Sequence, residues 1–303
     1  MLTTVAGVAL QHLTRLTDGQ IGAVRALVGR CADNDGVSPL NEDALLGLRA
    51  PDRRHLLLDE GAAGYATIAD GTVQLMVDPV RRRAGLGAGL AGAVAGTGAD
   101  TTGGSEIRGW WAFGDLPGAR ALANRRGLAP ARELLRLGRP LIGLPAARAL
   151  PDRARLRTFE PGRDDNAWLA VNARAFANHP EQGRMTAEDL AARIAEDWFD
   201  PAGLLLAVDA DDPDRVLGFH WTKVTAEDPQ SGEVYVLGVD PAAAGGGLGG
   251  ALLDAGLAHL IAHGATTVDL YVEGDNTAAL GLYRRAGFTE LARDVMYAER
   301  TAG

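Results

Sequence analysis

The sequence predicts a mixed α/β fold, with an α+β sheet, in which one domain of about 150 residues occurs twice. Three observations lead to this prediction. The chain has 303 residues, of which 47% are hydrophobic and 23% charged, a composition typical of a globular protein long enough for two cores. Short motifs return at a nearly constant spacing. In the second half, strand-like and helix-like segments alternate.

The repeat is defined by motifs that recur 162 residues apart (239 − 77 = 247 − 85 = 162). They are Val77-Asp78-Pro79 with Val239-Asp240-Pro241, and Gly85-Leu86-Gly87 with Gly247-Leu248-Gly249. Farther along, Gly114-Asp115 matches Gly274-Asp275 at a spacing of 160 (274 − 114 = 160). A shared offset over several positions indicates a duplicated domain.

Prolines at positions 140, 145 and 151 would break any helix in succession and mark the boundary between the copies. We therefore predict a first domain over residues 1–143, a linker over 144–155 and a second domain over 156–303. A strand begins the second domain at residues 156–159.

Periodicity and end signals predict the next elements of the second copy. Residues 165–177 carry apolar side chains at helical spacing, and residues 186–199 open with Thr186, Glu188 and Asp189, which are typical of a helix N-terminus. An apolar run at 204–208 predicts a buried strand. Residues 217–224 and 233–239 are rich in β-branched and aromatic side chains and flank a turn at 229–232, so they predict a hairpin.

The remaining segments predict a helix at 248–263, a strand at 267–272, a helix at 276–286 and a final strand at 290–298.

The strand at 233–239 ends in Asp240-Pro241, and a glycine-rich turn over 244–250 leads into the helix. Glycines let a backbone approach a ligand closely and point its N–H groups into a concavity, and the helix adds its positive end. This turn suits a pyrophosphate, although an ordinary helix-start loop would look similar. A dinucleotide fold is disfavoured, because the turn follows the fourth strand of its domain rather than the first.

Charge and composition limit the possible partners. Residues 1–150 hold 17 basic and 14 acidic side chains (+3), so residues 151–303 hold 13 and 25 (−12), which together give the net charge of −9. An acidic second half argues against nucleic acid. No apolar run reaches about 18 residues and no signal peptide is visible, so we expect a cytoplasmic protein with no membrane partner. We also expect a monomer.

Two single residues are notable. The one cysteine, Cys31, cannot form an internal disulfide and has no His or Cys partner at metal-ligand spacing, so we expect no metal. Lys223 is the one lysine among 30 Lys and Arg residues. In a chain where arginine is used wherever charge alone matters, this lysine is a candidate for a specific role. His179 and His220 are expected to be structural.

The order of these motifs resembles the GNAT superfamily of acetyltransferases. The resemblance is carried by the Val-Asp-Pro strand end, the Gly-x-Gly helix, Asp275-Asn276 and residues 282–288 (Leu-Tyr-Arg-Arg-Ala-Gly-Phe). The tandem copies, together with residues 179–183, 218–223, 232–241 and 270–276, resemble the mycothiol synthase family of actinobacteria. This resemblance implies two tandem GNAT-like domains and acetyl-CoA as co-substrate. It also implies transfer of the acetyl group to the cysteine amine of cysteinyl-glucosaminyl-inositol, a thiol-containing pseudo-disaccharide, as the last step of mycothiol synthesis.

Comparison of the copies assigns the chemistry to the second. Acetyl transfer from a thioester to an amine needs a base for the ammonium proton and an acid for the departing thiolate. The candidates are Glu233 as base, acting through water, and Tyr283 as acid; the first copy has Gly71 (233 − 162) and Ala123 (283 − 160) instead. Alternatively, Glu233 is a solvated strand-end carboxylate and Tyr283 a core tyrosine. By strand alternation, Glu233, Tyr235, Leu237 and Val239 should share one face.

The resemblance also implies which residues bind the two substrates. Acetyl-CoA would contact Leu237, Gly238, Val239, Ala244, Gly245, Gly246, Gly247, Leu248, Gly249, Gly250 and Asn276 in the second copy, and Leu75, Met76 and Val77 in the first. The acceptor would contact Glu42, Glu181, Lys223, Glu233 and Tyr271. One departure is Ala244, where the superfamily usually has Gln or Arg, as the first copy does at Arg82.

Two other functions fit the same sequence. A tandem acetyltransferase for a different amine would keep the glycine turn and Tyr283 but would not need Glu42, Glu181 and Lys223. A non-catalytic acetyl-CoA sensor would tolerate loss of Glu233 and Tyr283.

Overall fold

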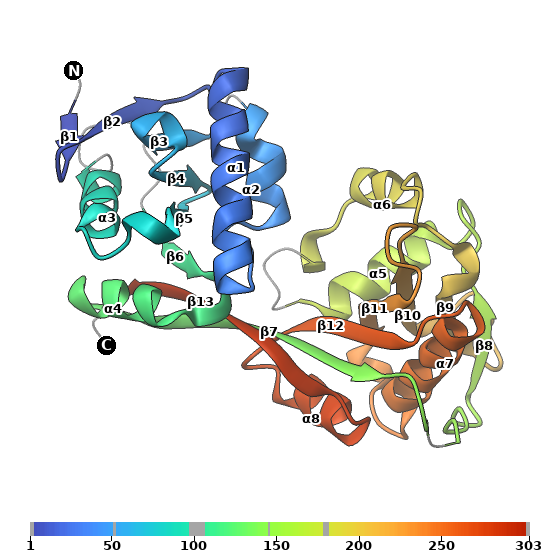
Figure 1. Cartoon of the computed structure of the whole chain (residues 1–303). Coiled ribbons are helices and arrows are strands. Elements are labelled where there is room, and N and C mark those ends of the chain that lie inside the picture. The colour runs from blue at the N-terminus through green and yellow to red at the C-terminus, as the bar shows by residue number, and fades with distance from the viewer. Residues whose placement is uncertain (1–2, 51–52, 97–106, 145, 178–181, 301–303) are drawn as a thin grey trace. The chain divides into compact units, whose positions relative to one another are not determined.

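The computed structural model describes residues 3–50, 53–96, 107–144, 146–177 and 182–300 (Figure 1). The chain packs into two compact units. Unit 1 comprises Met1–Leu134 and Ala292–Gly303, and unit 2 comprises Leu135–Leu291. The boundaries at 143 and 156 describe the repeat along the chain and stay a prediction.

Unit 1 is a sheet with helices on both faces. Its elements are β1 (Thr3–Val5), β2 (Val8–Leu13), α1 (Asp18–Asp35), α2 (Glu42–Leu46), β3 (Arg54–Leu58), β4 (Gly64–Ala69), β5 (Thr72–Val77), α3 (Leu86–Gly96), β6 (Gly109–Ala112), α4 (Pro117–Arg125), the first part of β7 (Leu128–Pro140) and most of β13 (Thr289–Glu299). The sheet order is β1-β2-β3-β4-β5-β6-β13. Leu57 packs with α1 and α2, whereas Leu56 and Leu58 pack with α3, as strand alternation requires.

Unit 2 repeats this plan. Its elements are β8 (Ala154–Thr158), α5 (Asp165–Ala175), α6 (Ala187–Ile194), β9 (Leu204–Asp209), β10 (Val216–Val224), β11 (Ser231–Val239), α7 (Leu248–Ala262), β12 (Thr267–Glu273) and α8 (Thr277–Arg285), and the sheet order is β7-β12-β11-β10-β9-β8. Short 3-10 turns include η3 (Pro79–Arg81), η6 (Pro201–Gly203) and η7 (Pro241–Ala243). One face of the sheet packs against α7 and α8, and the opposite face against α5 and α6.

The predicted α/β fold is confirmed, and the predicted elements of the second copy agree closely with the observed ones. The exception is the helix predicted over 186–199, which ends at Ile194. Trp198 and Phe199 lie beyond it and pack against the aromatic cluster around Trp221. Tertiary packing of these two rings therefore overrides the helical periodicity. Within the described parts of the chain, every helix is too short or too polar to cross a bilayer.

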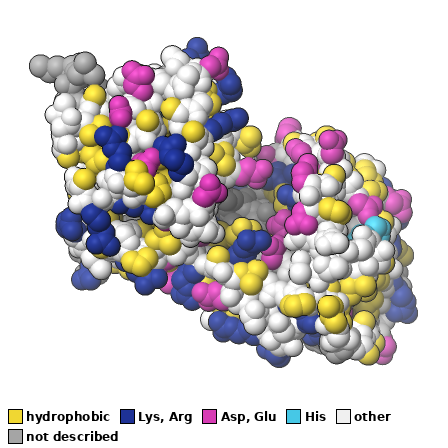
Figure 2. Space-filling view, in the orientation of Figure 1, with side chains coloured by type: hydrophobic (Ala, Val, Ile, Leu, Met, Phe, Trp, Pro, Cys, Tyr) yellow, Lys and Arg dark blue, Asp and Glu magenta, His cyan; other side chains and the backbone are white. Residues whose placement is uncertain are grey.

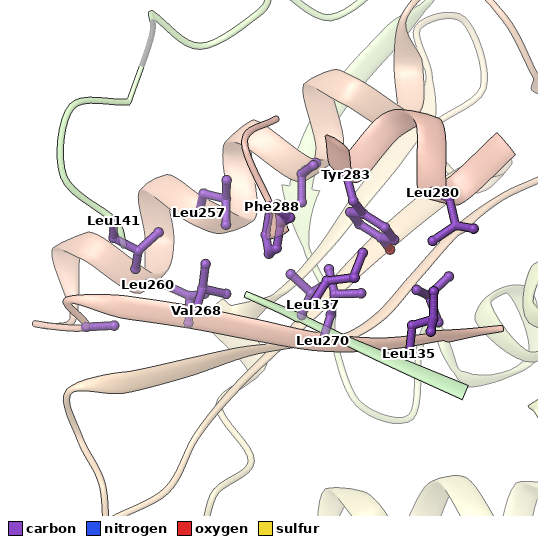
Figure 3. Close-up of a cluster of buried hydrophobic side chains, with 14 residues drawn as sticks. Leu135, Leu137, Leu141, Leu257, Leu260, Val268, Leu270, Leu280, Tyr283 and Phe288 are labelled. Carbon is purple, nitrogen blue, oxygen red and sulfur yellow. The ribbon is translucent and has the colours of Figure 1, made fainter. Parts of the chain in front are cut away.

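Two strands contribute to both units. The end of β7 supplies Leu135 and Leu137 to the core of unit 2, where they pack with residues of α7, α8 and β12 (Figure 3). In return, the end of β13 pairs with β6 of unit 1, with Val295 opposite Ala112 and Tyr297 opposite Trp110. Each unit is therefore completed by the last strand of the other repeat.

The strand pair β10–β11 contains a register shift next to the candidate site. Trp221 pairs with Val236 and Thr222 with Val234, which leaves Tyr235 as an extra residue. Tyr235 packs with the α5–α6 face, while Leu237 and Val239 pack with the α7 face. The prediction that Glu233, Tyr235, Leu237 and Val239 share one face was therefore wrong, because a bulge adds one residue and reverses the alternation beyond it.

Candidate functional site

The glycine turn of unit 2 has the backbone of an anion-binding loop. Asp240 accepts a hydrogen bond from the Ala242 N–H (3.0 Å) and so caps η7. Gly245, Gly246 and Gly247 follow with φ of +92°, +63° and +83°, a left-handed run that only glycine adopts without strain. Helix α7 then begins at Leu248, and its first N–H groups have no partner within the helix. Such a turn at a helix N-terminus presents amide hydrogens and a positive dipole to an anion.

Two arginines that sequence reasoning missed lie beside this turn. A Cβ on Gly250 would collide with the guanidinium of Arg148, and a Cβ on Gly246 would lie 4.0 Å from Arg153 Nη2. Arg148 is held by Asp254 through Nε and Nη2 (both 2.7 Å), and Arg153 Nη2 donates to the Ala243 carbonyl (2.7 Å). Both come from the segment between the repeats, about a hundred residues before the turn. Arg153 brings positive charge to a turn that has Ala244 in place of Gln or Arg, whereas the charge of Arg148 is balanced by Asp254.

The corresponding turn of unit 1 is built differently. Its left-handed residues are Arg83 (φ +65°) and Gly85 (φ +82°). Arg82 is bound within the protein, because it donates to both carboxylate oxygens of Asp35 (2.7 and 2.6 Å) and to the Val77 carbonyl (3.1 Å). The hydrogen bonds to Asp35 raise the pKa of Arg82. Leu75, Met76 and Val77 form the end of β5, where Met76 pairs with Tyr65.

Strands β11 and β12 separate ahead of the glycine turn. Their parallel ladder runs from Ser231–Thr267 to Glu233–Asp269, while β11 continues to Val239. In unit 1 the ladder of β5 and β6 reaches Gln74–Trp111, and β5 ends at Val77. Among the residues described, unit 2 therefore has the longer open strand edge. It also has the bulge at Tyr235, whereas β4 and β5 pair in unbroken register.

A row of four charged side chains crosses the sheet where this opening begins. Lys223 on β10 pairs with Glu233 on β11, which pairs with Asp269 on β12. Arg136 on β7 donates from Nε to Asp269 Oδ2 (2.7 Å). The residues on either side of Asp269 and Arg136 belong to the core under α7 and α8, so this charged row lies on the opposite face of the sheet.

The pKa of Arg136 is affected by the candidate base, Glu233. Burial opposes the charged form of Arg136, but its hydrogen bond to Asp269, together with the nearby Tyr271 and Glu233, raises its pKa overall. Tyr271 lies on β12 two residues beyond Asp269 and is 52% exposed. Sequence reasoning missed Arg136 and Asp269, because neither belongs to a motif and the row exists only once β7 joins the sheet of unit 2.

Lys223 is held by aromatic rings. Its Nζ lies 4.8 Å from the centre of the Trp198 ring and 5.4 Å from that of Tyr235, within the range of cation–π attraction. Arg193 Nε donates to the Tyr235 hydroxyl (3.1 Å), which fixes the second ring. The structure thus places the ammonium of Lys223, which the sequence predicted to have a specific role, beside two aromatic rings. Trp198 was assigned by sequence only to a helix.

The candidate acid Tyr283 comes from the other side of the sheet. Its ring extends from α8 toward the strands, in contact with Phe288 at a centroid distance of 5.6 Å (Figure 3). Only 6% of the residue is exposed, and burial raises the pKa of its hydroxyl. Leu282, its neighbour, lies near the glycine turn, since a Cβ on Gly249 would be 3.9 Å from Leu282 Cδ2. A buried phenol of this kind keeps its proton at neutral pH.

The other predicted site residues have separate positions. Asn276 is the N-cap of α8, where its side chain accepts from the Ala279 N–H (3.1 Å). Glu42 begins α2 in unit 1 and is exposed. Glu181 and His179 lie outside the residues that the structure describes. His220 is structural, as expected: its Nδ1 donates to the Leu252 carbonyl (2.8 Å), and burial lowers its pKa to about 4.

A mixed sheet whose strands separate beside a left-handed glycine turn, at the start of a helix, is typical of the GNAT class of acetyltransferases. The family model "Acetyltransferase (GNAT) family" matches residues 168–288. Two solved structures share the fold over 97% of this chain: a GCN5-related N-acetyltransferase from Sphaerobacter thermophilus (TM-score 0.73, 24% identity, 97% of that chain) and a tandem GNAT protein from the clavulanic acid biosynthesis pathway (TM-score 0.68, 19% identity, 100% of that chain).

The sequence comparison is more specific. The mycothiol acetyltransferase of Thermobispora bispora is 50% identical over 295 residues, which cover 93% of this chain and 97% of the relative. This chain belongs to the mycothiol acetyltransferase family of GNAT N-acetyltransferases.

Proposed function

We propose that unit 2 transfers an acetyl group from acetyl-CoA to the cysteine amine of cysteinyl-glucosaminyl-inositol, the last step of mycothiol synthesis. The observation that carries this proposal is the charged row beside the opening between β11 and β12, directly ahead of the glycine turn. Family membership supports the acetyl transfer and the pathway.

The glycine turn would receive the pyrophosphate of acetyl-CoA. Backbone N–H groups of residues 245–250 supply the hydrogen bonds, and Arg153 adds positive charge beside them. Residues 237–239 of β11 pair with β10 along one edge, so their other edge faces the opening and can line the thioester arm. Asn276 caps α8 at the same end of the unit.

Glu233 would accept the proton of the substrate ammonium through a water molecule. An α-amino group has a pKa near 7.7–8.0, so roughly a tenth of it is already neutral at pH 7. A weak base is therefore sufficient to deprotonate the rest. The neutral amine then forms the new C–N bond at the thioester carbonyl carbon. Backbone N–H groups near Leu237–Val239 stabilise the carbonyl oxygen as it gains charge.

Tyr283 would complete the transfer. When the C–S bond breaks, its hydroxyl gives a proton to the departing thiolate, and the CoA thiol forms. The amine loses two protons overall: Glu233 takes the first, and the second replaces the proton that Tyr283 gave up. Burial raises the pKa of this hydroxyl, so Tyr283 is protonated at neutral pH and carries the proton that the thiolate needs.

The charged row would orient the acceptor. A polyhydroxylated substrate with an ammonium group needs both carboxylates and cationic donors at fixed positions. Lys223 and Arg136 provide donors, and Glu233 and Asp269 provide carboxylates. Glu42, Glu181 and Tyr271 are proposed as further substrate contacts. Acidic side chains also gather on the visible face of unit 2 (Figure 2), which suits a cationic substrate and argues against nucleic acid.

In unit 1, the proposed contacts of Leu75, Met76 and Val77 with acetyl-CoA would be non-catalytic. This unit has Gly71 and Ala123 at the positions of Glu233 and Tyr283. We also propose that the protein acts in the cytoplasm, where acetyl-CoA is available, and that it is a monomer.

The direct test is to incubate the protein with acetyl-CoA and the cysteinyl pseudo-disaccharide and to follow CoA release. Release above the rate of thioester hydrolysis, with formation of the N-acetyl product, is expected. Release with another amine but none with this substrate would refute the acceptor assignment. Acetyl-CoA binding without release with any amine would identify a sensor.

A further inference from the structure

The end of α7 opposite the glycine turn carries a cluster of metal-ligating side chains that the proposed reaction does not use. Asp200 precedes η6, His259 lies in the last turn of α7, and His263 is the residue that follows the helix. Each offers one ligand atom, and the three atoms lie within 4.8 Å of one another. We propose that Asp200, His259 and His263 bind a divalent transition-metal ion of the zinc type.

The spacing of the ligand atoms fits such an ion. His259 Nε2 and Asp200 Oδ2 are 3.3 Å apart. With metal–ligand bonds of about 2.0–2.1 Å, two ligands of a tetrahedral zinc ion are separated by about 3.3 Å. One edge of the coordination polyhedron is therefore already formed. The remaining contraction would have to come from His263, which is exposed, and water would occupy the fourth position.

Hydrogen bonds already orient the two outer ligands. Asp200 Oδ1 accepts from the Ala202 N–H (2.9 Å), which leaves Oδ2 toward His259. His263 Nδ1 donates to the His259 carbonyl (2.8 Å), so the lone pair resides on Nε2. A ligand whose second polar atom is fixed by the backbone is the usual arrangement around protein metal sites.

The helix favours a cation at this point. His259 and His263 are four residues apart and lie on one face of α7, with ring centroids 4.1 Å apart. The C-terminal end of a helix carries partial negative charge, which stabilises a bound cation. Two imidazoles and one carboxylate select zinc and its neighbours over Mg²⁺ and Ca²⁺, which prefer all-oxygen sites. Sequence reasoning expected no metal and did not bring these three residues together, since Asp200 is remote from the histidines in the chain.

The test uses untagged full-length protein from which metal has been removed with a chelator. Calorimetric titration with Zn²⁺ should give one site per chain, and Co²⁺ should give the visible absorption of a four-coordinate ion. His263→Gln, at an exposed position, should lower Zn²⁺ affinity at least about tenfold, and Asp200→Asn should do the same. His12→Gln, at an exposed histidine of unit 1, is the matched control and should leave the affinity unchanged.

Absence of Zn²⁺ binding, or equal affinity in His263→Gln and the unmodified protein, would overturn the proposal. Equal affinity for Mg²⁺ would also overturn it, because the nitrogen ligands would then have no role. These readouts measure binding and do not depend on the acetyl-transfer assignment.

Discussion

The ammonium of Lys223 lies over the rings of Trp198 and Tyr235 and pairs across the strands with Glu233. A compact ammonium fits this position, whereas the planar fork of arginine is larger and distributes its charge differently. Lys223 is the one lysine among 30 Lys and Arg residues, so this position holds the one compact ammonium side chain of the sequence.

We therefore expect Lys223→Arg to raise the KM for the acceptor by about fivefold, which corresponds to about 1 kcal/mol, because the larger guanidinium does not present the same compact donor. Steady-state kinetics at saturating acetyl-CoA measure the effect. Arg25→Lys, an exposed exchange on α1, is the control and should change nothing. An unchanged acceptor KM in Lys223→Arg would remove Lys223 from the acceptor site.

The hydroxyl of Tyr283 has no hydrogen-bond partner among the described residues, and its ring packs in the core. Tyr283→Phe should therefore keep the packing and change the melting temperature little. Because the variant lacks the hydroxyl that donates the proton, kcat should fall by about 10². The affinity for acetyl-CoA should stay nearly intact. Measurement of kcat beside calorimetric acetyl-CoA binding separates the two effects. A normal kcat would make Tyr283 a core residue only.

Among the elements, the glycine turn shows most clearly how the backbone prepares a site. Gly245 has φ of +92° and open space around its Cα, and Gly264, just after α7, has φ of +91° with equally open space. An alanine at either position therefore meets the same backbone strain of about 1–2 kcal/mol and no clash. The two glycines differ in whether they lie in the proposed pyrophosphate loop.

Gly245→Ala should weaken acetyl-CoA binding several-fold, while Gly264→Ala should lose similar stability and bind normally. Calorimetric titration with acetyl-CoA and thermal melting of both variants provide the comparison. Equal acetyl-CoA affinity in the two variants would contradict the assignment of the turn.

Two buried histidines, one in each sheet, make stability depend on pH. Burial lowers the pKa of His55 and of His220 to about 4 each, against an ordinary value near 6.5. Both imidazoles are neutral in the folded protein. Their contribution to the free energy of unfolding is complete above pH 6.5 and is lost as the pH falls toward 4, because the unfolded chain takes up protons there that the folded protein does not. Each contributes up to about 3 kcal/mol by this shift.

We expect the melting temperature to fall steadily between pH 6.5 and 4.5, with proton uptake on unfolding. The paired aspartates with lowered pKa, such as Asp164 and Asp254, act at lower pH. A flat melting temperature over this range would show that the two histidines are solvated.

Local sequence patterns predicted the elements of unit 2 because amphipathic spacing and cap signals act over a few residues. They did not predict the end of α6 or the bulge at Tyr235, since both depend on the packing of Trp198, Trp221 and Tyr235 across strands. The same holds for the site. The glycine turn and Lys223 were predicted from the sequence. Arg136 and Asp269 were not, because they come together only when β7 lies beside β12.

At the scale of the whole molecule, the last strand of each repeat completes the other unit. Leu135, Leu137 and Leu141 are each at most 6% exposed in the core of unit 2. A core Leu→Ala change costs about 2–5 kcal/mol, so losing all three side chains removes about as much free energy as the 5–15 kcal/mol by which a domain is stable.

A fragment of residues 144–303 should therefore fail to fold cooperatively, even though it contains the whole second repeat. Thermal melting followed by near-UV circular dichroism tests this, with the full chain as reference. A cooperative transition and acetyltransferase activity in the fragment would contradict the exchange of strands between units.

In the proposed function, acetyl transfer takes place beside Glu233 in unit 2. The most direct measurement is the kcat for CoA release, with the cysteinyl pseudo-disaccharide as acceptor, in Glu233→Gln. Glu188→Gln, at an exposed carboxylate of α6, is the matched control. We expect Glu233→Gln to lose about 10² in kcat while it still binds acetyl-CoA, and Glu188→Gln to behave as the unmodified protein. Full turnover in Glu233→Gln would contradict the account.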